Sequence, residues 1–364
     1  MKNLLKLLSS KWVFEKPKKR KILIYDSYSL DYSKYLFPKS RCELLNVRYE
    51  NINMYVGILS LFSNYNLSLV DRYKKTFIDI VSPKIVYTTI DNNPAFFKLK
   101  AISNKPIYIS DQNGMSKVAD SYKQESFYGD LKKYTKENKK MPEADHIFLF
   151  GKNDRDRISK TIKGKIHLFG NTKNNHFVIK RKKVKKKITS IMFISSGLWP
   201  VALKHDQIIF KNLTKFCKKN NIKLTFYGRL DISGETYHRN NFEKGDWVYL
   251  PRVNTAKTYN NLNKQQMLVL SHSTLGFQAL AKGIKCAFFY TCFPEKGCHL
   301  KFPKTGTFWT NSLTYYDFEK TLNKVISFSA THWKKIAKKY SKKILGYDPG
   351  NIKKKKIIKM ASKL

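Results

Sequence analysis

The chain has 364 residues, of which 42% are hydrophobic and 14% aromatic, so it carries enough apolar material for packed cores and is not intrinsically disordered. Its length favours two domains over one. The 71 Lys and Arg residues far outnumber the 26 Asp and Glu residues; the formal net charge of +45 favours polyanionic partners, namely nucleic acid, an anionic membrane surface or phosphorylated substrates.

Cysteine spacing does not indicate a metal site. The five cysteines include no C-x-x-C pair, and Cys286, Cys292 and Cys298 are spaced more widely than the ligands of structural zinc sites. Reduced thiols in a cytoplasmic protein are therefore expected.

Residues 1–20 form a basic segment with an amphipathic start. Leu4, Leu5, Leu8 and Trp12 fall on one helical face, whereas lysines interrupt the apolar run that a signal peptide requires. Two alternatives follow: a weak interfacial anchor on the inner face of the cytoplasmic membrane, or a terminal helix packed on the body. No run in the sequence approaches the roughly 18 apolar residues of a membrane span.

A first domain is expected over residues 21–179. Apolar runs of strand length alternate with amphipathic helical patterns, an order typical of a parallel α/β sheet. The expected strands are 21–25, 42–47, 84–90, 106–110, 144–150 and 166–170, and the expected helices are 56–62, 69–81, 95–101 and 151–162.

Polar clusters follow three of these strands. In an open parallel sheet, ligands bind outside the carboxyl ends of the strands, so the clusters are expected to meet along one edge. The alternative is that Asp, Asn and Gly at strand ends simply form turns. The clusters are Asp26-Ser27-Tyr28, Asp91-Asn92-Asn93 and Asp111-Gln112-Asn113-Gly114.

The Lys/Arg run at 180–187 predicts a linker, after which a second α/β domain is expected over 188–345. A Lys-rich tail, 346–364, completes the chain and could fold only against a partner or the body. The expected strands of the second domain are 190–195, 223–227, 247–250, 266–270 and 284–290, the expected helices are 206–218, 258–262, 275–282, 313–327 and 333–345, and 231–246 is a polar excursion.

The stretch between the last two of these strands has the pattern of a phosphate-binding turn. Ser271, Ser273 and Thr274 are good N-cap residues, and Gly276 falls in the first turn of the short helix that follows. Gly283 can adopt the left-handed conformation that ends this helix. Free amides and the positive helix end would both point at an anion there. The alternative is an ordinary βαβ unit whose hydroxyl groups only cap a helix.

Other phosphate and metal motifs are missing. The sequence has neither G-x-G-x-x-G nor G-x-x-x-x-G-K-[ST], which argues against a dinucleotide dehydrogenase and a P-loop NTPase. Asp154-Arg155-Asp156 imitates a D-x-D metal motif, but acidic residues are favoured by the dipole in the first turn of a helix. No metal site is therefore expected.

Three short segments resemble the hallmarks of a bacterial family of surface carbohydrate biosynthesis proteins, related to the GT-B class of glycosyltransferases. The same family pattern is met by Phe150-Gly151-Lys152-Asn153-Asp154, by Gly170-Asn171, and by Tyr227-Gly228-Arg229 with Glu235 downstream. The resemblance covers roughly residues 20–345. The three segments are 89–100 (TIDNNPAFFKLK), 112–114 (QNG) and 273–283 (STLGFQALAKG).

The resemblance implies two Rossmann-like parallel-sheet domains that face a central cleft. It implies transfer of a sugar from a nucleotide-sugar to a saccharide or lipid-linked acceptor in surface polysaccharide or lipopolysaccharide biosynthesis, without metal or cofactor. A basic protein of this kind would be a peripheral partner of an anionic membrane.

The resemblance also implies roles for named residues. The donor would be bound by Gly228, Arg229, Glu235, Ser273, Thr274, Leu275, Gly276 and Gln278. Asp91, or as second choice Asp26, would be the general base, and the acceptor would contact Asn92, Asn93, Gln112, Asn113 and Gly114.

One position departs from the family pattern. Gln278 stands where relatives tend to have Glu, and an amide carries no charge with which to hold sugar hydroxyls. The alternatives are therefore a GT-B nucleotide-sugar epimerase, a polyol-phosphate transferase or an inactive relative. Nucleic-acid binding is suggested by charge alone, since no helix interleaves Arg with aromatic residues.

Overall fold

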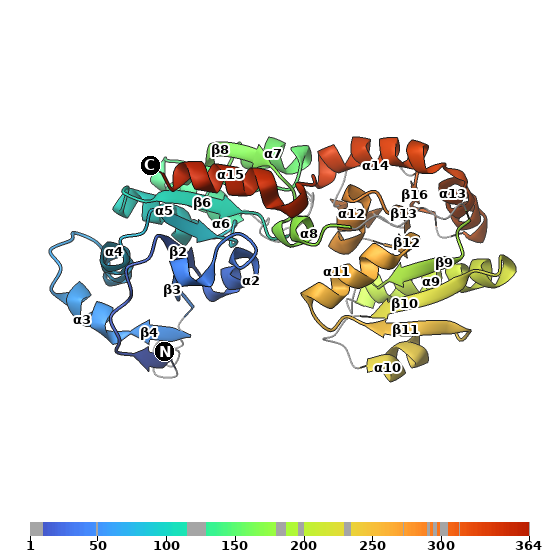
Figure 1. Cartoon of the computed structure of the whole chain (residues 1–364), viewed down its shortest axis with the longest axis horizontal. Coiled ribbons are helices and arrows are strands. Elements are labelled where there is room, and N and C mark those ends of the chain that lie inside the picture. Colours follow the sequence, from blue (N-terminus) through green and yellow to red (C-terminus); the bar gives the residue numbers. More distant parts are fainter. Residues whose placement is uncertain are drawn as a thin grey trace. The chain divides into compact units, whose positions relative to one another are not determined.

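The computed structural model describes residues 10–48, 50–114, 129–179, 187–195, 200–228, 234–271, 273–289, 292–293, 297–298, 305–312 and 314–363. These residues divide into two compact units (Figure 1). Unit 1 comprises those within 1–113, 127–176 and 350–364, and unit 2 comprises those within 114–126 and 177–349. The chain therefore leaves unit 1, builds unit 2 and returns to unit 1.

Unit 1 contains a six-stranded parallel sheet in the order β3-β2-β5-β6-β7-β8. Because β3 follows β2 on one side and β5 extends the sheet on the other, the direction of winding reverses between β2 and β5. The strands are β2 (Ile22–Tyr25), β3 (Cys42–Leu45), β5 (Ile85–Thr88), β6 (Ile107–Asp111), β7 (Glu143–Leu149) and β8 (Lys163–Leu168).

Both faces of this sheet are covered, as continuous apolar strands require. Leu23 and Val86 belong to one hydrophobic cluster, whereas Ile24 and Ile85 belong to a second cluster, as the alternation of side chains along a strand dictates. The helices of unit 1 are α2 (Leu30–Ser33), α3 (Met54–Leu61), α4 (Leu69–Val81), α5 (Pro94–Ile102), α6 (Gly129–Asn138), α7 (Lys152–Ile158), α8 (Thr172–His176) and α15 (Ile352–Ala361).

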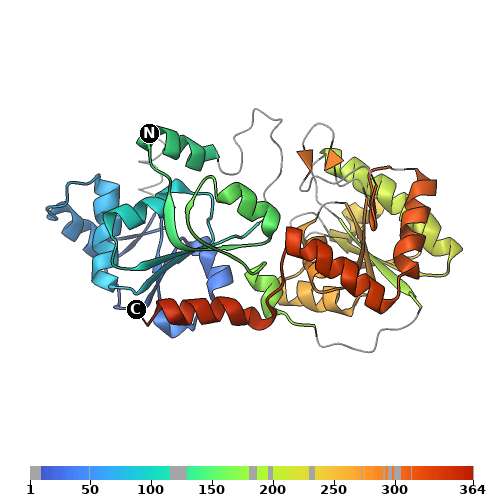
Figure 2. The same ribbon diagram turned by 90° about the horizontal axis from the view of Figure 1, so that it is seen from above.

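The last helix, α15, supplies part of the second cluster. Its Ile358 and Ala361 are buried there with Ile24 and Phe148. Figures 1 and 2 both show α15 lying along the sheet of unit 1. The Lys-rich end of the chain is therefore folded into unit 1, and no pattern in the sequence indicates this return.

A small two-stranded sheet accompanies unit 1. Strand β1 (Lys11–Val13) pairs in parallel with β4 (Asn51–Asn53), which leads directly into α3. Trp12 lies in β1, so the helix that was expected to include it does not reach that far; Leu4, Leu5 and Leu8 lie outside the described residues.

Unit 2 contains a second six-stranded parallel sheet, in the order β11-β10-β9-β12-β13-β16. In the numbering of this unit alone the order is 3-2-1-4-5-6, the doubly wound Rossmann order, and winding reverses between β9 and β12. The strands are β9 (Ser190–Ile194), β10 (Lys223–Gly228), β11 (Trp247–Pro251), β12 (Met267–Leu270), β13 (Lys285–Phe289) and β16 (Trp309–Thr310), with a separate pair β14 (Cys292–Phe293) and β15 (Gly297–Cys298).

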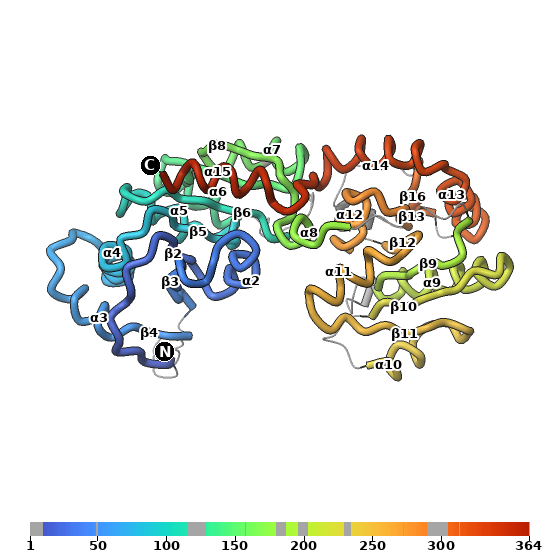
Figure 3. The backbone as a smooth tube through the Cα atoms, viewed as in Figure 1, coloured from blue at the N-terminus to red at the C-terminus, as the bar shows by residue number. Residues whose placement is uncertain are grey.

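The described helices of unit 2 alternate with these strands. The tube in Figure 3 follows the chain from β12 into α12 and back into β13. The helices are α9 (Pro200–Lys219), α10 (Gly234–Asn241), α11 (Thr255–Lys264), α12 (Thr274–Ala281), α13 (Tyr315–Ser327) and α14 (Ala330–Ile344).

The predicted fold class, α/β with two parallel sheets, is confirmed. Helix α4 has the predicted bounds, and Pro94 occupies the first turn of α5 as expected. Helix α10 was missed, because the polar composition of 231–246 predicted an excursion without regular structure. Strands β1, β4 and β16 were missed as well, since strands of two or three residues leave little periodicity to detect.

Candidate functional site

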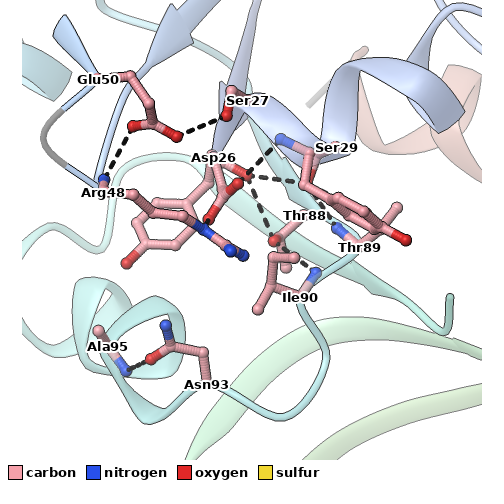
Figure 4. Close-up of polar contacts among 12 residues, drawn as sticks. Asp26, Ser27, Ser29, Arg48, Glu50, Thr88, Thr89, Ile90, Asn93 and Ala95 are labelled. Atoms are coloured by element: carbon pink, nitrogen blue, oxygen red, sulfur yellow. Dashed lines mark hydrogen bonds and ion pairs between the residues drawn. The ribbon is translucent and has the colours of Figure 1, made fainter. Parts of the chain in front are cut away.

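Asp26 directly follows β2, at the point where the sheet of unit 1 reverses its winding. Its φ of 76° and ψ of 133° are rare for a residue with a side chain, and its side chain is fully buried. One carboxylate oxygen accepts the backbone N–H of Tyr28 at 2.9 Å, and the other accepts Nε of Arg48. Glu50 in turn accepts the amide of Arg48 and the hydroxyl of Ser27 (Figure 4). Both oxygens of Asp26 are thus already engaged.

Hydroxyl groups join the ends of β2 and β5. Ser29 donates to the carbonyl of Tyr25 at 2.9 Å and accepts the amide of Thr89, also at 2.9 Å. The hydroxyl of Thr88 accepts the amide of Ile90 at 3.0 Å. These bonds fix the turn that precedes Asp91 (Figure 4).

In the cluster Asp91-Asn92-Asn93, Asp91 is a buried carboxylate and Asn93 is a helix cap. Asp91 is only 2% exposed. Asn93 caps α5, because its side-chain oxygen accepts the amide of Ala95 at 2.8 Å. Asn92 is half-buried between them. The side chain of Asn93 therefore has the local structural role that was the alternative to ligand binding.

The third cluster reaches the same edge. Asn113 donates to the carbonyl of Thr89 at 2.9 Å, which ties the end of β6 to the end of β5. Gln112 is fully buried, and its side chain accepts the amide of Phe150 at 2.8 Å. Gly114 is half-buried, and a Cβ there would meet no atom within 4 Å. The structure therefore joins the turns after β2, β5 and β6, as their strand-end positions predict.

Asp111, directly before this cluster, has a structural partner that the sequence did not indicate. Lys354 of α15 donates to one carboxylate oxygen of Asp111 at 2.6 Å, and Tyr87 donates to the other at 2.9 Å. Lys354 also donates to Thr172 at 2.7 Å. Asp111 and Lys354 are both fully buried. Burial raises the pKa of Tyr87 well above its ordinary value, so it donates this hydrogen bond as a neutral phenol.

In unit 2, the turn after β12 presents an uncapped helix end at the winding reversal. Ser273 is the N-cap of α12 with an extended backbone, yet its hydroxyl makes no capping hydrogen bond. The Gly276 amide bonds the Ser273 carbonyl at 3.0 Å. The amides of Thr274 and Leu275, in the first turn, have no acceptor within the helix. This helix end offers N–H donors, two hydroxyl groups and a positive dipole to an anion.

The two glycines of this unit are explained by geometry. A Cβ at Gly276 would lie 2.2 Å from Cδ1 of Leu270, so glycine lets α12 approach β12. Gly283 has φ of 82°, the left-handed conformation predicted for the end of α12. Its amide bonds the carbonyl of Leu280, and the amide of Ile284 bonds the carbonyl of Ala279, which together form a Schellman cap.

Gln278 points into the interior of unit 2. It is 5% exposed, and its side-chain oxygen accepts the hydroxyl of Tyr259 of α11 at 2.9 Å. The ring of Tyr259 stacks on Phe177, and Nζ of Lys282 lies 4.8 Å from its centre. The amide thus holds α12 against α11 in this structure.

The remaining predicted donor residues differ in their surroundings. Gly228 ends β10, and a Cβ there would lie 2.6 Å from the hydroxyl of Tyr249 and 2.8 Å from Nε2 of His238. Glu235 is exposed and pairs with Arg239 along its own helix at 2.7 Å. Arg229 lies outside the described residues.

Arg252 is a cation at this edge that sequence reasoning missed. Its guanidinium donates to the carbonyl of Ser195, at the end of β9, at 2.7 Å, and its amide bonds the carbonyl of Gly228 at 3.3 Å. The hydroxyl of Ser195 donates to the buried Asp206 at 3.1 Å. Arg252 follows β11 directly, so the strand-end rule applied to the acidic clusters could have found it.

The described part of the chain contains neither a candidate metal cluster nor a candidate membrane span. No group of three or more His, Cys, Asp and Glu side chains within it could hold a metal ion. None of its helices combines the length and apolar character that crossing a membrane demands.

Part of the chain matches a known protein family. Residues 197–362 match the model of a family described as "putative O-antigen biosynthesis protein". The resemblance to surface carbohydrate biosynthesis proteins, predicted from the motifs, is thus confirmed over that range. None of the curated proteins matches the chain.

Solved structures with the same fold include a polymerase and a protein described as a putative epimerase. The wall teichoic acid polymerase TagF, with CDPG, is 11% identical with a TM-score of 0.54, covering 95% of this chain and 90% of that one. A "putative UDP-N-acetylglucosamine 2-epimerase" from Listeria monocytogenes is 12% identical with a TM-score of 0.58, covering 95% and 96%. S. aureus MnaA with UDP is 11% identical with a TM-score of 0.53, covering 96% of each chain. These likenesses confirm the GT-B fold.

Proposed function

We propose that this chain, with its match to an O-antigen biosynthesis family, is a metal-independent glycosyltransferase of bacterial surface polysaccharide synthesis. It moves a sugar from a nucleotide-sugar, bound by unit 2, to a saccharide or lipid-linked acceptor, bound by unit 1, on the inner face of an anionic membrane. The observation that carries the proposal is the start of α12, where the Ser273 hydroxyl makes no capping hydrogen bond at the winding reversal of a Rossmann sheet.

The chemistry follows from where charge develops. When the bond to the sugar breaks, negative charge accumulates on the departing nucleoside diphosphate. Donors fixed in advance around those oxygens stabilise the transition state more than the ground state. The amides of Thr274 and Leu275 and the hydroxyl of Ser273 supply neutral donors, and Arg252 and Arg229 supply cationic ones.

The acceptor hydroxyl needs a general base. Asp91 suits this role better than Asp26, because both oxygens of Asp26 already accept hydrogen bonds from Tyr28 and Arg48. Asp91 is held at a turn fixed by Ser29 and Asn113. In this proposal the ion pair of Asp26 and Arg48 stabilises the turn after β2, and Asp91 accepts the proton of the acceptor hydroxyl.

A second candidate is a nucleotide-sugar epimerase, and the fold shared with epimerases supports it. Gln278, which stands where the family pattern has Glu and is held by Tyr259 inside unit 2, does not distinguish an epimerase from a transferase. A polyol-phosphate transferase or an inactive relative remains compatible with the same turn. Nucleic-acid binding has no support beyond net charge.

The test begins with thermal unfolding of the full chain in the presence of UDP, CDP, UDP-N-acetylglucosamine and CDP-glycerol. A nucleotide that binds the folded state raises the Tm in proportion to the logarithm of its concentration. We expect at least one to do so without added metal. If none stabilises the protein, the nucleotide site is wrong.

The stabilising nucleotide-sugar then separates the two candidates. A transferase releases a nucleoside diphosphate only when an acceptor is present. An epimerase converts the sugar while the nucleotide stays attached and needs no acceptor. Conversion without an acceptor would replace the transferase by the epimerase.

A further inference from the structure

Large apolar side chains stand exposed on α3 and on the turn that joins it to α4. Ile58, Leu61 and Phe62 share one helical face and are 50%, 60% and 80% exposed. Leu69 and Val70, at the start of α4, are 52% and 56% exposed. In Figure 1, α3 lies at the outer edge of unit 1, away from the sheet.

This apolar surface is continuous with β1. Strand β1 pairs with β4, and β4 runs into α3. Trp12 in β1 is 39% exposed and Phe14 directly after it is 72% exposed. Aromatic side chains of this kind favour the boundary between water and lipid. We call Trp12, Phe14, Ile58, Leu59, Leu61, Phe62, Leu69 and Val70 the apolar patch.

The part of the patch on α3 and α4 comes from a stretch without cations, although the chain is rich in them. Lys and Arg account for 71 of 364 residues, yet none occurs between Arg48 and Arg72. Scattered exposed apolar residues need no explanation, but a contiguous group of this size usually marks an interaction surface.

Cations surround a groove at the base of the patch. The groove has a volume of about 600 Å³ and is lined by Lys16, Lys18, Arg20 and Lys39. Asn53, which also lines it, caps the start of α3, and Nζ of Lys16 lies 5.7 Å from the ring centre of Tyr55 on α3. Two carboxylates in the lining, Glu15 and Glu43, leave the cations in excess.

We propose that the apolar patch inserts into the surface of an anionic lipid bilayer while the cations of the groove bind lipid headgroup phosphates. Exposed apolar side chains bordered by Lys and Arg match the two attractions that hold a monotopic protein at a membrane. A protein partner offers no comparable match, because nothing in the patch provides charged groups for it to pair. The inference rests on the proposed membrane partner. It places the membrane contact at α3 and the neighbouring β1, and not at the ends of the chain.

The experiment is co-sedimentation of the full chain with vesicles of phosphatidylcholine alone or mixed with phosphatidylglycerol. Binding is expected to the mixed vesicles and to weaken with salt. Leu61→Ser/Phe62→Ser is expected to lower binding by at least about tenfold, since each residue loses the burial energy of a large apolar side chain. Lys16→Glu/Lys18→Glu is expected to remove the preference for phosphatidylglycerol.

Matched controls make the result specific. Tyr316→Ser changes a residue of unit 2 that is 72% exposed, and its binding is expected to equal that of the parent. Because Leu61 and Phe62 are exposed, their variant should unfold at the parent temperature. Phe62→Trp adds a positive signal, a blue shift of fluorescence on mixing with vesicles.

Each of the other outcomes overturns the proposal. The parent protein could fail to bind mixed vesicles, or the Leu61→Ser/Phe62→Ser variant could bind as the parent does. Light scattering could show that this variant only dissociates a dimer, which would make a second copy the occupant. A chain without residues 1–9 could lose vesicle binding although the patch is intact, and membrane binding would then be assigned to residues 1–9. No nucleotide is present, so failure here is separate from failure of the transferase proposal.

Discussion

Lys354 of α15 donates to Asp111 of β6, and solvent reaches neither side chain. Removing one partner of a buried ion pair leaves the other charge uncompensated, at a cost of about 3–5 kcal/mol. Lys354→Met is therefore expected to destabilise unit 1 by that amount in urea unfolding. Lys359→Met, on the exposed side of the same helix, should change little. Equal stability of the two variants would mean that the pair does not anchor α15.

Ser273 and Ser329 are both N-cap serines of unit 2, but they should respond in opposite ways. Ser329 accepts the amide of His332 at 3.2 Å, whereas Ser273 makes no cap bond. Ser329→Ala is expected to cost about 1 kcal/mol of stability and to leave nucleotide binding unchanged. Ser273→Ala should keep stability and weaken nucleotide binding severalfold, as measured by titration calorimetry. A loss of stability without a loss of affinity at Ser273 would refute the phosphate turn.

Gly276→Ala tests the close approach of α12 to β12. The added methyl group would overlap Leu270, so we expect destabilisation by about 1–3 kcal/mol and weaker nucleotide binding as the helix start shifts. Gly57→Ala is the matched control: it is also helical, and a Cβ there meets nothing within 4 Å. That variant should gain up to about 1 kcal/mol, because alanine favours the helix. Thermal unfolding of both variants checks the pair.

Burial lowers the pKa of Lys282 from 10.5 to about 7. Between these values the unfolded chain binds a proton that the folded chain does not, so this residue makes stability rise with pH from about 7 to 10.5. Its charged form costs stability below that window. Lys282→Met should remove this part of the pH dependence, measured as the difference between the two unfolding curves across the window. Parallel curves would show that Lys282 titrates normally.

Asp91→Asn tests the choice of general base. With the transferase assay in hand, turnover is expected to fall by about 10²–10⁴ while nucleotide affinity stays unchanged, because an amide cannot accept the proton. Asp26→Asn should instead lower stability, since it breaks the ion pair with Arg48. If Asp26→Asn abolishes turnover in a stable protein and Asp91→Asn does not, Asp26 is the general base and Asp91 is not.

The elements that sequence reasoning found are those whose signal is local. Strands β2 and β12 are unbroken apolar runs, and their buried positions follow from composition alone. Gly283 was found because only glycine takes its backbone conformation cheaply. Helix α15 was missed because Lys354 looks solvated until its partner, more than two hundred residues earlier, is known.

The sequence predicted which residues lie at the strand ends, but not the contacts of their side chains. Strand ends identified the clusters at Asp26, Asp91 and Asn113, and the structure joins them by hydrogen bonds through Ser29 and Thr89. Side-chain partners were out of reach. That Gln278 accepts from Tyr259 depends on a tertiary neighbour, which no spacing in one sequence reveals. The cap that Asn93 forms on α5 is by contrast local, because Asn directly before Pro94 is a sequence signal of a helix start.

The return of the chain to unit 1 has a consequence for how the protein is made. During synthesis, residues 22–149 leave the ribosome long before α15 does, so one face of their sheet lacks Ile358 and Ala361 until α15 has been made. Unit 2 does not include α15, so it can fold before α15 is made. A nascent or prematurely terminated chain would therefore expose an apolar sheet face and an unpaired Asp111, a form that chaperones and proteases are suited to recognise.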